Sequence, residues 1–149
     1  MKAELTQKLF NKYPKIFSKT ERDTKDNLLY FGIDHDDGWY GLIDNLCNAI
    51  QTYIDSDHNI PQVDRNKPQV VAVQVKEKFG MLRFYVEASD EFIEGMIRLA
   101  ENLSGTICEK CGTTKKVGKT CGWIKTLCKS CYLCNDILSK REWIANTVA

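Results

Sequence analysis

The sequence predicts an α+β fold in which two core helices pack on a β-hairpin or small antiparallel sheet, followed by a C-terminal zinc-ribbon-like module. Three observations predict it. Apolar residues recur at helical spacing in residues 38–55 and 90–104. Between these stretches, residues 69–88 read as two strands around a tight turn. After them, residues 106–149 hold six of the seven cysteines, grouped in short pairs.

Two helices are expected in the first third of the chain. Residues 4–17 form a short amphipathic pattern that Pro14 ends or breaks. Residues 38–55 form a core helix whose exposed N–H groups Asp36 or Asp37 can cap. Its apolar positions are Trp39, Leu42, Ile43, Leu46, Cys47, Ile50, Tyr53 and Ile54. We expect the cysteine among them to be a small buried apolar residue rather than a metal ligand.

The strongest strand signal lies in residues 69–75 and 81–88, joined by a turn near residues 78–80. The residues expected to share one face are Val71, Val73 and Val75 on the first strand and Leu82, Phe84 and Val86 on the second. The opposite face carries Val70, Ala72, Gln74, Arg83 and Tyr85. Because that second face is only half polar, another element can cover it as well.

A second core helix is predicted at residues 90–104, beginning at residues 89–91 and stopping at Gly105. The side chains expected to point inward are Phe92, Ile93, Met96, Ile97, Ala100 and Leu103. After the last cysteines, residues 133–145 are expected to form a closing helix.

Charge and length suggest one compact body with a small appended module. The 149 residues suit a body at 1–105 and a zinc-binding module at 106–149. The body has 13 Lys and Arg against 17 Asp and Glu, whereas the module has 8 against 3. The sequence shows no apolar run that predicts a membrane span and no signal peptide. Paired cysteines without an export signal favour metal binding in a reducing, cytoplasmic compartment over disulfides.

The cysteine spacing predicts the metal site. Two C-x-x-C pairs, Cys108 with Cys111 and Cys128 with Cys131, are separated by 16 residues. That pattern is typical of four thiolates around zinc or a substitute metal, with each pair gripping one side of the tetrahedral ion. Cys121 and Cys134 are alternative ligands, and Cys134 is the more plausible substitute because it forms a third C-x-x-C with Cys131.

Several of these motifs together resemble a known group of proteins. They are DGWYGLIDNLCNAIQ at 37–51, PQVVAVQVKEKFGMLRFYVEASD at 68–90, and CEKCG with GWIKTLC between 108 and 128. This combination resembles a family of small uncharacterised phage and prophage proteins with a C-terminal four-cysteine zinc module. The resemblance covers roughly residues 37–131. It implies a phage-encoded protein that acts in the bacterial cytoplasm, and it supplies neither a reaction nor catalytic residues.

An enzymatic function is the weaker interpretation. A ββα-metal nuclease needs a histidine base beside its metal, and neither His35 nor His58 lies in the module. Four thiolates leave a zinc ion no open position for a substrate. A metal-dependent nuclease would need another site, such as a strand carrying residues 74–76 or magnesium held by an acidic cluster. The cluster comprises Asp34, His35, Asp36 and Asp37, with Asp44 as a further ligand, and its other interpretation is a capped helix start.

Binding is the stronger interpretation, and two kinds of partner are open. The residues expected to contact a partner are Lys115, Lys116, Lys119, Trp123 and Lys125. Lysines around an aromatic can neutralise phosphates and stack on a base of a nucleic acid. The same tryptophan can anchor a protein partner: a host protein, such as a component of a defence system, or a phage protein. The lysines also suit a simple solvated hairpin face. The net charge of only +1 favours the protein partner.

Overall fold

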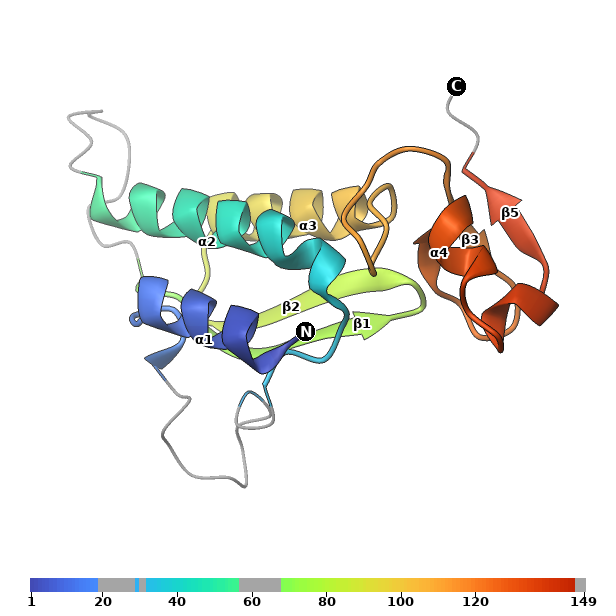
Figure 1. Cartoon of the computed structure of the whole chain (residues 1–149). Helices are drawn as coiled ribbons and strands as arrows, with labels where there is room; N and C mark the ends of the chain where they lie inside the picture. Colours follow the sequence, from blue (N-terminus) through green and yellow to red (C-terminus); the bar gives the residue numbers. More distant parts are fainter. Residues whose placement is uncertain (19–28, 30–31, 57–67, 147–149) are drawn as a thin grey trace.

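The computed structural model describes residues 1–18, 29, 32–56 and 68–146, and in this part of the chain it confirms the α+β class (Figure 1). The elements of the body are α1 (Ala3–Lys12), the 3-10 turn η3 (Asp37–Trp39), α2 (Tyr40–Asp55), β1 (Val71–Lys78), β2 (Met81–Glu87) and α3 (Glu91–Ser104). Those of the C-terminal region are β3 (Val117–Thr120), β4 (Thr126–Cys128), α4 (Lys129–Leu133), η4 (Leu138–Lys140) and β5 (Trp143–Ala145). No helix among the described residues is long and apolar enough to cross a membrane.

Helices α2 and α3 lie side by side over one face of the β1–β2 hairpin, and α1 lies beside them (Figure 1). Burial of the predicted apolar face of α2 explains this packing, because Trp39, Ile43 and Ile50 are fully inaccessible to solvent. Cys47 is also fully buried, as expected for a small apolar residue. The apolar spacing in the sequence therefore places the core of the body correctly.

The start of α2 differs from the prediction. Neither Asp36 nor Asp37 caps this helix with its side chain. Asp37 instead accepts a hydrogen bond from the backbone N–H of Lys2 at 2.8 Å and pairs with the Lys2 ammonium, so it stabilises the start of α1. The second core helix does carry the expected cap, because Asp90 accepts from the backbone N–H of Ile93 at 2.9 Å.

A β-bulge corrects the predicted faces of β1. The antiparallel register shifts between Ala72 and Gln74, so Val73 is an extra residue without a partner on β2. The extra residue moves every later side chain of the strand to the opposite face. Ala72, which precedes the bulge, and Val75, which follows it, are therefore both buried. The prediction that Val71 and Val73 share the inner face with Val75 is therefore wrong, since both are half-exposed.

Helix α3 supplies polar side chains to the outer edge of β2. Ser104 accepts a hydrogen bond from the backbone N–H of Leu82 at 2.8 Å, and Glu101 accepts from that of Phe84 at 3.1 Å. These contacts fix which side of α3 faces the hairpin. As a result Phe92 and Leu103, which were predicted to point inward, are 65% and 43% exposed.

The C-terminal region forms a second small sheet with strand order β4-β3-β5. A closing helix at 133–145 was expected, and this prediction is wrong: α4 ends at Leu133 and β5 pairs with β3. Asn135 begins the turn that follows, because its side chain accepts from the backbone N–H of Leu138 at 2.8 Å. Trp143 then covers Gly118, where any Cβ would lie 2.7 Å from the indole ring.

Candidate metal centre

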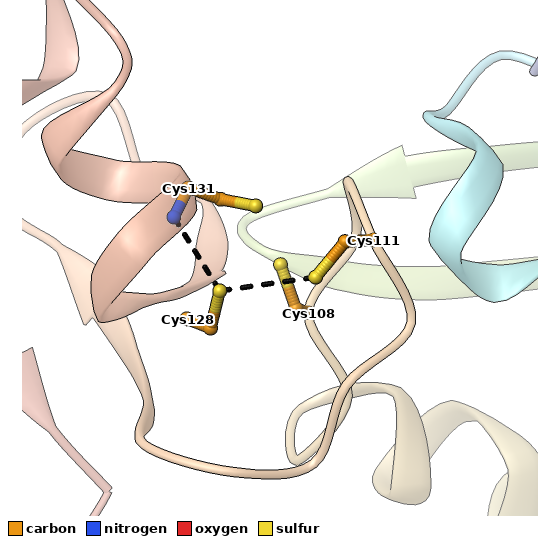
Figure 2. Close-up of side chains that lie close together, drawn as sticks. All are labelled: Cys108, Cys111, Cys128 and Cys131. Carbon is orange, nitrogen blue, oxygen red and sulfur yellow. Dashed lines mark hydrogen bonds between the residues drawn. The ribbon is translucent and has the colours of Figure 1, made fainter.

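Four cysteines meet where the C-terminal region joins the body (Figure 2). Cys108 and Cys111 lie on the loop after α3, whereas Cys128 and Cys131 lie at the beginning of α4. The four Sγ atoms all lie within 4.8 Å of one another, and Figure 2 shows the side chains converging from the loop and the helix. All four are free thiols rather than disulfides.

Local backbone geometry positions the first pair. The N–H of Gly112 donates to the carbonyl of Cys108 at 2.8 Å, and the N–H of Cys108 donates to the carbonyl of Thr113 at 2.8 Å. These two bonds close a tight turn under the sulfurs. Gly112 adopts a φ of +77°, which residues with a Cβ rarely adopt.

The first turn of α4 positions the second pair. The N–H of Cys131 donates to Sγ of Cys128 at 3.4 Å. Burial opposes ionisation of the Cys128 thiol, but this N–H and the neighbouring thiols outweigh it and lower the pKa of Cys128 below its ordinary value. Burial and the neighbouring thiols instead raise the pKa of Cys108 and Cys131, so Cys128 forms the metal-binding thiolate most readily of these three.

The sulfur geometry fits a tetrahedral metal ion. A tetrahedral site with metal–sulfur bonds of ~2.3 Å separates its sulfurs by about 3.8 Å. The Sγ atoms of Cys111 and Cys128 are 3.8 Å apart. This pair already has the tetrahedral spacing, and all four Sγ atoms lie within 4.8 Å of one another, so the cluster could hold a metal ion after shifts of about 1 Å or less. Among the described residues it is also the one group of histidines, cysteines and carboxylates close enough to do so.

The alternative cysteine ligands lie outside the cluster. Cys121 follows β3 and is half-buried, and its backbone N–H donates to the carbonyl of Glu142. Cys134 is exposed at the end of α4. The structure thus brings together the symmetric set of two pairs.

The acidic cluster of the sequence does not gather into a second metal site. Asp44 binds Lys12 at 2.7 Å and Tyr13 at 2.8 Å, away from the start of α2. Asp34 forms a short parallel bridge with Lys76 on β1. His35 is buried, and its Nδ1–H donates a hydrogen bond to the carbonyl of Asp36 at 2.6 Å.

Burial lowers the pKa of His35 to about 4, with the N-terminal ammonium and Lys125 adding to the effect. This imidazole is therefore neutral near pH 7. The other histidine, His58, lies outside the described residues.

The metal-binding loop is built into the body, a feature that the sequence did not predict. Gly38 donates its backbone N–H to the carbonyl of Glu109 at 2.7 Å. A Cβ at Gly38 would lie 2.2 Å from the carbonyl oxygen of Cys108, so only glycine fits. Trp39 donates its indole N–H to the carbonyl of Ile107 at 3.0 Å. At the hairpin turn, the hydroxyl of Thr126 donates to the carbonyl of Gly80.

A buried ion pair and a third charged residue also join the C-terminal region to the body. Glu109 is fully buried, and its carboxylate lies 2.7 Å from the ammonium of Lys125. The same ammonium lies 3.0 Å from the carboxylate of Glu77 on β1. Burial opposes the charge of Lys125, but these two carboxylates outweigh it and raise the pKa of the lysine above its ordinary value.

The residues expected to bind a partner fall into two groups. Lys115, Lys116 and Trp123 are exposed, and Trp123 is 66% exposed. Lys119 is half-buried on β3. Lys125 is half-buried, and its ammonium pairs with the carboxylates of Glu109 and Glu77.

A hollow on the C-terminal region lies beside the exposed tryptophan. We name it the Trp123 hollow, and its lining residues are Trp123, Lys125, Asn135, Ile137, Leu138 and Arg141. Ile137 is 72% exposed, so two large apolar side chains face solvent here. The sequence analysis identified Trp123 but missed Ile137, because a predicted helix occupied that stretch.

Comparison with models of known protein families, with curated protein sequences and with solved structures finds no match for this chain. The proposals for this site therefore rest on its residues and on their arrangement.

Proposed function

We propose that the four-cysteine cluster binds zinc, and that this zinc stabilises the structure and takes no part in a reaction. Four sulfur ligands within 4.8 Å of one another favour zinc among the abundant divalent ions. Four protein ligands leave no position for water or substrate, which is typical of a structural site. The ion ties the loop after α3 to the start of α4, so it holds the C-terminal region against the body.

We further propose that the protein acts by docking on another protein through the Trp123 hollow. The exposed indole beside Ile137 supports this proposal, because aromatic anchors surrounded by aliphatic and cationic groups dominate binding energy at protein interfaces. Arg141, which also lines the hollow, can pair with a carboxylate of the partner.

The engagement of Lys125 removes one of the cations that were expected to contact a nucleic acid. Lys125 pairs with buried carboxylates, and Lys129 lies over the rings of Tyr132 and Trp143 at 4.8 and 4.6 Å. The ammonium of Lys125 is therefore not free to bind a phosphate, whereas Lys129 is exposed. The other exposed cations of the C-terminal region are Lys110, Lys115, Lys116, Lys140 and Arg141, so nucleic acid is kept as the alternative outcome of the test.

The resemblance to phage proteins suggests where this docking takes place. We propose that the protein acts in the bacterial cytoplasm, on a host protein such as a component of a defence system or on a phage protein. A reducing compartment would also keep the four thiols available for zinc.

A pull-down from bacterial lysate, with and without nuclease treatment, tests the proposal. We expect a protein partner that is retained after nuclease, lost with Trp123→Ala and kept with the double variant Lys115→Glu, Lys116→Glu. Truncation of a central aromatic anchor typically weakens binding by ~2 kcal/mol or more. Capture that disappears with nuclease and with the lysine variant, but survives Trp123→Ala, would identify nucleic acid as the partner instead.

A further inference from the structure

The lining of the Trp123 hollow narrows the choice of partner. Its volume is about 340 Å³, near the lower end of the range for sites that enclose a ligand. Trp123, Ile137 and Leu138 form its apolar part, and the first two are 66% and 72% exposed. The hollow therefore has room for a large apolar side chain of a partner together with a polar group beside it.

Three polar groups of the hollow can only donate hydrogen bonds to a ligand. Asn135 already uses its amide oxygen, which accepts from the backbone N–H groups of Ile137 and Leu138 at 3.1 and 2.8 Å, so its NH2 group remains for a ligand. The indole N–H of Trp123 and the guanidinium of Arg141 are donors without acceptor capacity. Within the described part of the chain, none of these three groups donates a hydrogen bond to another residue.

The backbone of Arg141 is held in place at the edge of the hollow. The hydroxyl of Tyr132 donates to the carbonyl of Arg141 at 2.8 Å, and the N–H of Arg141 donates to the carbonyl of Leu138 at 2.9 Å. Its guanidinium lies beside Gly122, where a Cβ would be only 2.5 Å from Nη1. A group that is positioned before binding loses less freedom when the partner arrives.

The guanidinium of Arg141 forms no ion pair with any residue that the structure describes. The nearest acids along the sequence, Asp136 and Glu142, are exposed, but neither lines the hollow. In the surrounding region of residues 106–149, 8 Lys and Arg stand against 3 Asp and Glu. This charge balance favours an anionic group as the ligand of the guanidinium.

Lys125, the other cation that lines the hollow, already has its counter-ions. Its ammonium lies between the carboxylates of Glu109 and Glu77, whose side chains are 0% and 15% exposed. Little of either carboxylate reaches solvent, and neither residue lines the hollow. The charge that remains for a ligand is therefore that of Arg141.

We infer that the Trp123 hollow binds a segment of a partner protein in which an Asp or Glu lies next to a large apolar residue. The apolar side chain covers Trp123 and Ile137, and the carboxylate accepts hydrogen bonds from Arg141 and Asn135. The two oxygens of a carboxylate match the parallel donors of a guanidinium. The inference rests on the proposed docking function, because it names the chemistry of the partner at the same site.

A nucleic acid satisfies this lining less completely. A base can stack on Trp123 and a phosphate can pair with Arg141. Stacking uses aromatic side chains, however, and leaves the exposed Ile137 uncovered. Nucleic acid is therefore one of the outcomes that the experiment distinguishes.

Selection from a library of random peptides tests the inference, with the full-length, zinc-loaded protein as bait. The peptides are displayed as an internal loop of a carrier protein, so that every carboxylate in them comes from a side chain. We expect the retained loops to share an Asp or Glu next to a large apolar residue. A library with free C-termini and a pool of random single-stranded DNA are selected in parallel.

Variants then show which group binds the acid. Arg141→Gln should weaken the binding of a retained loop by about tenfold or more, because it removes a hydrogen bond between charged groups. Replacing the acid of the loop by its amide should weaken binding to wild type similarly, and should add little to the effect of Arg141→Gln. Lys140→Gln is the matched control, because Lys140 is exposed beside Arg141 but does not line the hollow, and it should bind as wild type does.

The possible failures separate this inference from the docking proposal. Retained loops that lack an acid but still require Trp123 would overturn the inference and leave docking in place. Loops that bind wild type and Trp123→Ala equally would overturn both. Retention of free C-termini or of single-stranded DNA in place of acidic loops would overturn the inference, as would a selection that retains nothing.

Discussion

Gly38 in the 3-10 turn η3 and Gly112 at the end of the metal-binding loop lie backbone against backbone. A Cβ at Gly38 would lie 2.5 Å from the backbone nitrogen of Gly112, and a Cβ at Gly112 would lie 2.9 Å from the carbonyl oxygen of Gly38. Two positions 74 residues apart are thus both restricted to glycine by the same contact. The first pair of thiols is therefore held partly by the body.

Gly38→Ala should weaken metal binding although it changes no ligand. The new methyl group overlaps the Cys108 carbonyl and forces the loop away from α2. Overpacking of this kind typically destabilises by ~1–3 kcal/mol. Competition with a chelator should therefore remove the metal at a lower chelator concentration than from wild type. Gly41→Ala, where nothing lies within 4 Å, is the control and should retain the metal as wild type does.

The amount of metal bound by cysteine variants should depend only on the four clustered cysteines. We expect about one zinc ion per chain, with an X-ray absorption spectrum that reports four sulfur neighbours. Cys108→Ser should lose the metal and the order of the C-terminal region, because bound zinc contributes on the order of 10 kcal/mol to small zinc folds. The variants Cys47→Ala and Cys134→Ser should keep the metal. Freshly reduced protein without any metal would refute the assignment.

Chelation should melt the C-terminal region before the body. The hydrophobic core around α2, α3 and the β1–β2 hairpin contains no cluster cysteine. We therefore expect the amides of β1 and β2 to stay protected from hydrogen exchange after metal removal, whereas those of β3 and β4 exchange. The interface at Gly38 and Thr126 should open together with the metal site. Exchange of the whole chain at one rate would show that the body depends on the metal.

Removing Lys125 should destabilise the protein far more than an exposed lysine does. Lys125→Met leaves the fully buried carboxylate of Glu109 without its cation. Breaking one partner of a buried pair costs about 3–5 kcal/mol. Lys115→Met at an exposed position should change the free energy of unfolding by less than about 0.5 kcal/mol. Denaturant unfolding of the two variants measures the difference, and the double variant Lys125→Met, Glu109→Gln should recover part of the loss.

His35 should make the protein less stable in mild acid. The pKa of this buried imidazole is about 4 in the folded protein, against 6.5 ordinarily. Between these values the unfolded chain binds a proton that the folded chain does not, so stability falls as the pH drops from 6.5 toward 4. Over this range the protonation of His35 lowers the free energy of unfolding by about 3 kcal/mol.

The variant His35→Asn isolates the contribution of His35, because its amide N–H can replace the bond to the Asp36 carbonyl without titrating. The difference in unfolding free energy between wild type and variant should shrink or reverse over this range. A constant difference would contradict the assignment.

Sequence patterns alone predict the α+β class, the two core helices, the hairpin and the four clustered cysteines. These features depend on spacing within short stretches, such as the apolar positions of α2 and the C-x-x-C pairs. Helical and strand periodicity place such residues on one face whatever surrounds them. The position of Cys47 inside the core follows from the same rule.

The way in which these elements pack together could not be predicted from such patterns. The bulge at Val73 reverses the buried side of β1, and the fit of Trp143 over Gly118 makes a strand where a helix was predicted. The ion pair of Lys125 with Glu109 and Glu77 turns a predicted surface lysine into an internal contact. Each of these outcomes depends on atoms from segments far apart in the chain. The spacing of residues within one element does not predict such contacts, because they form only when the elements pack.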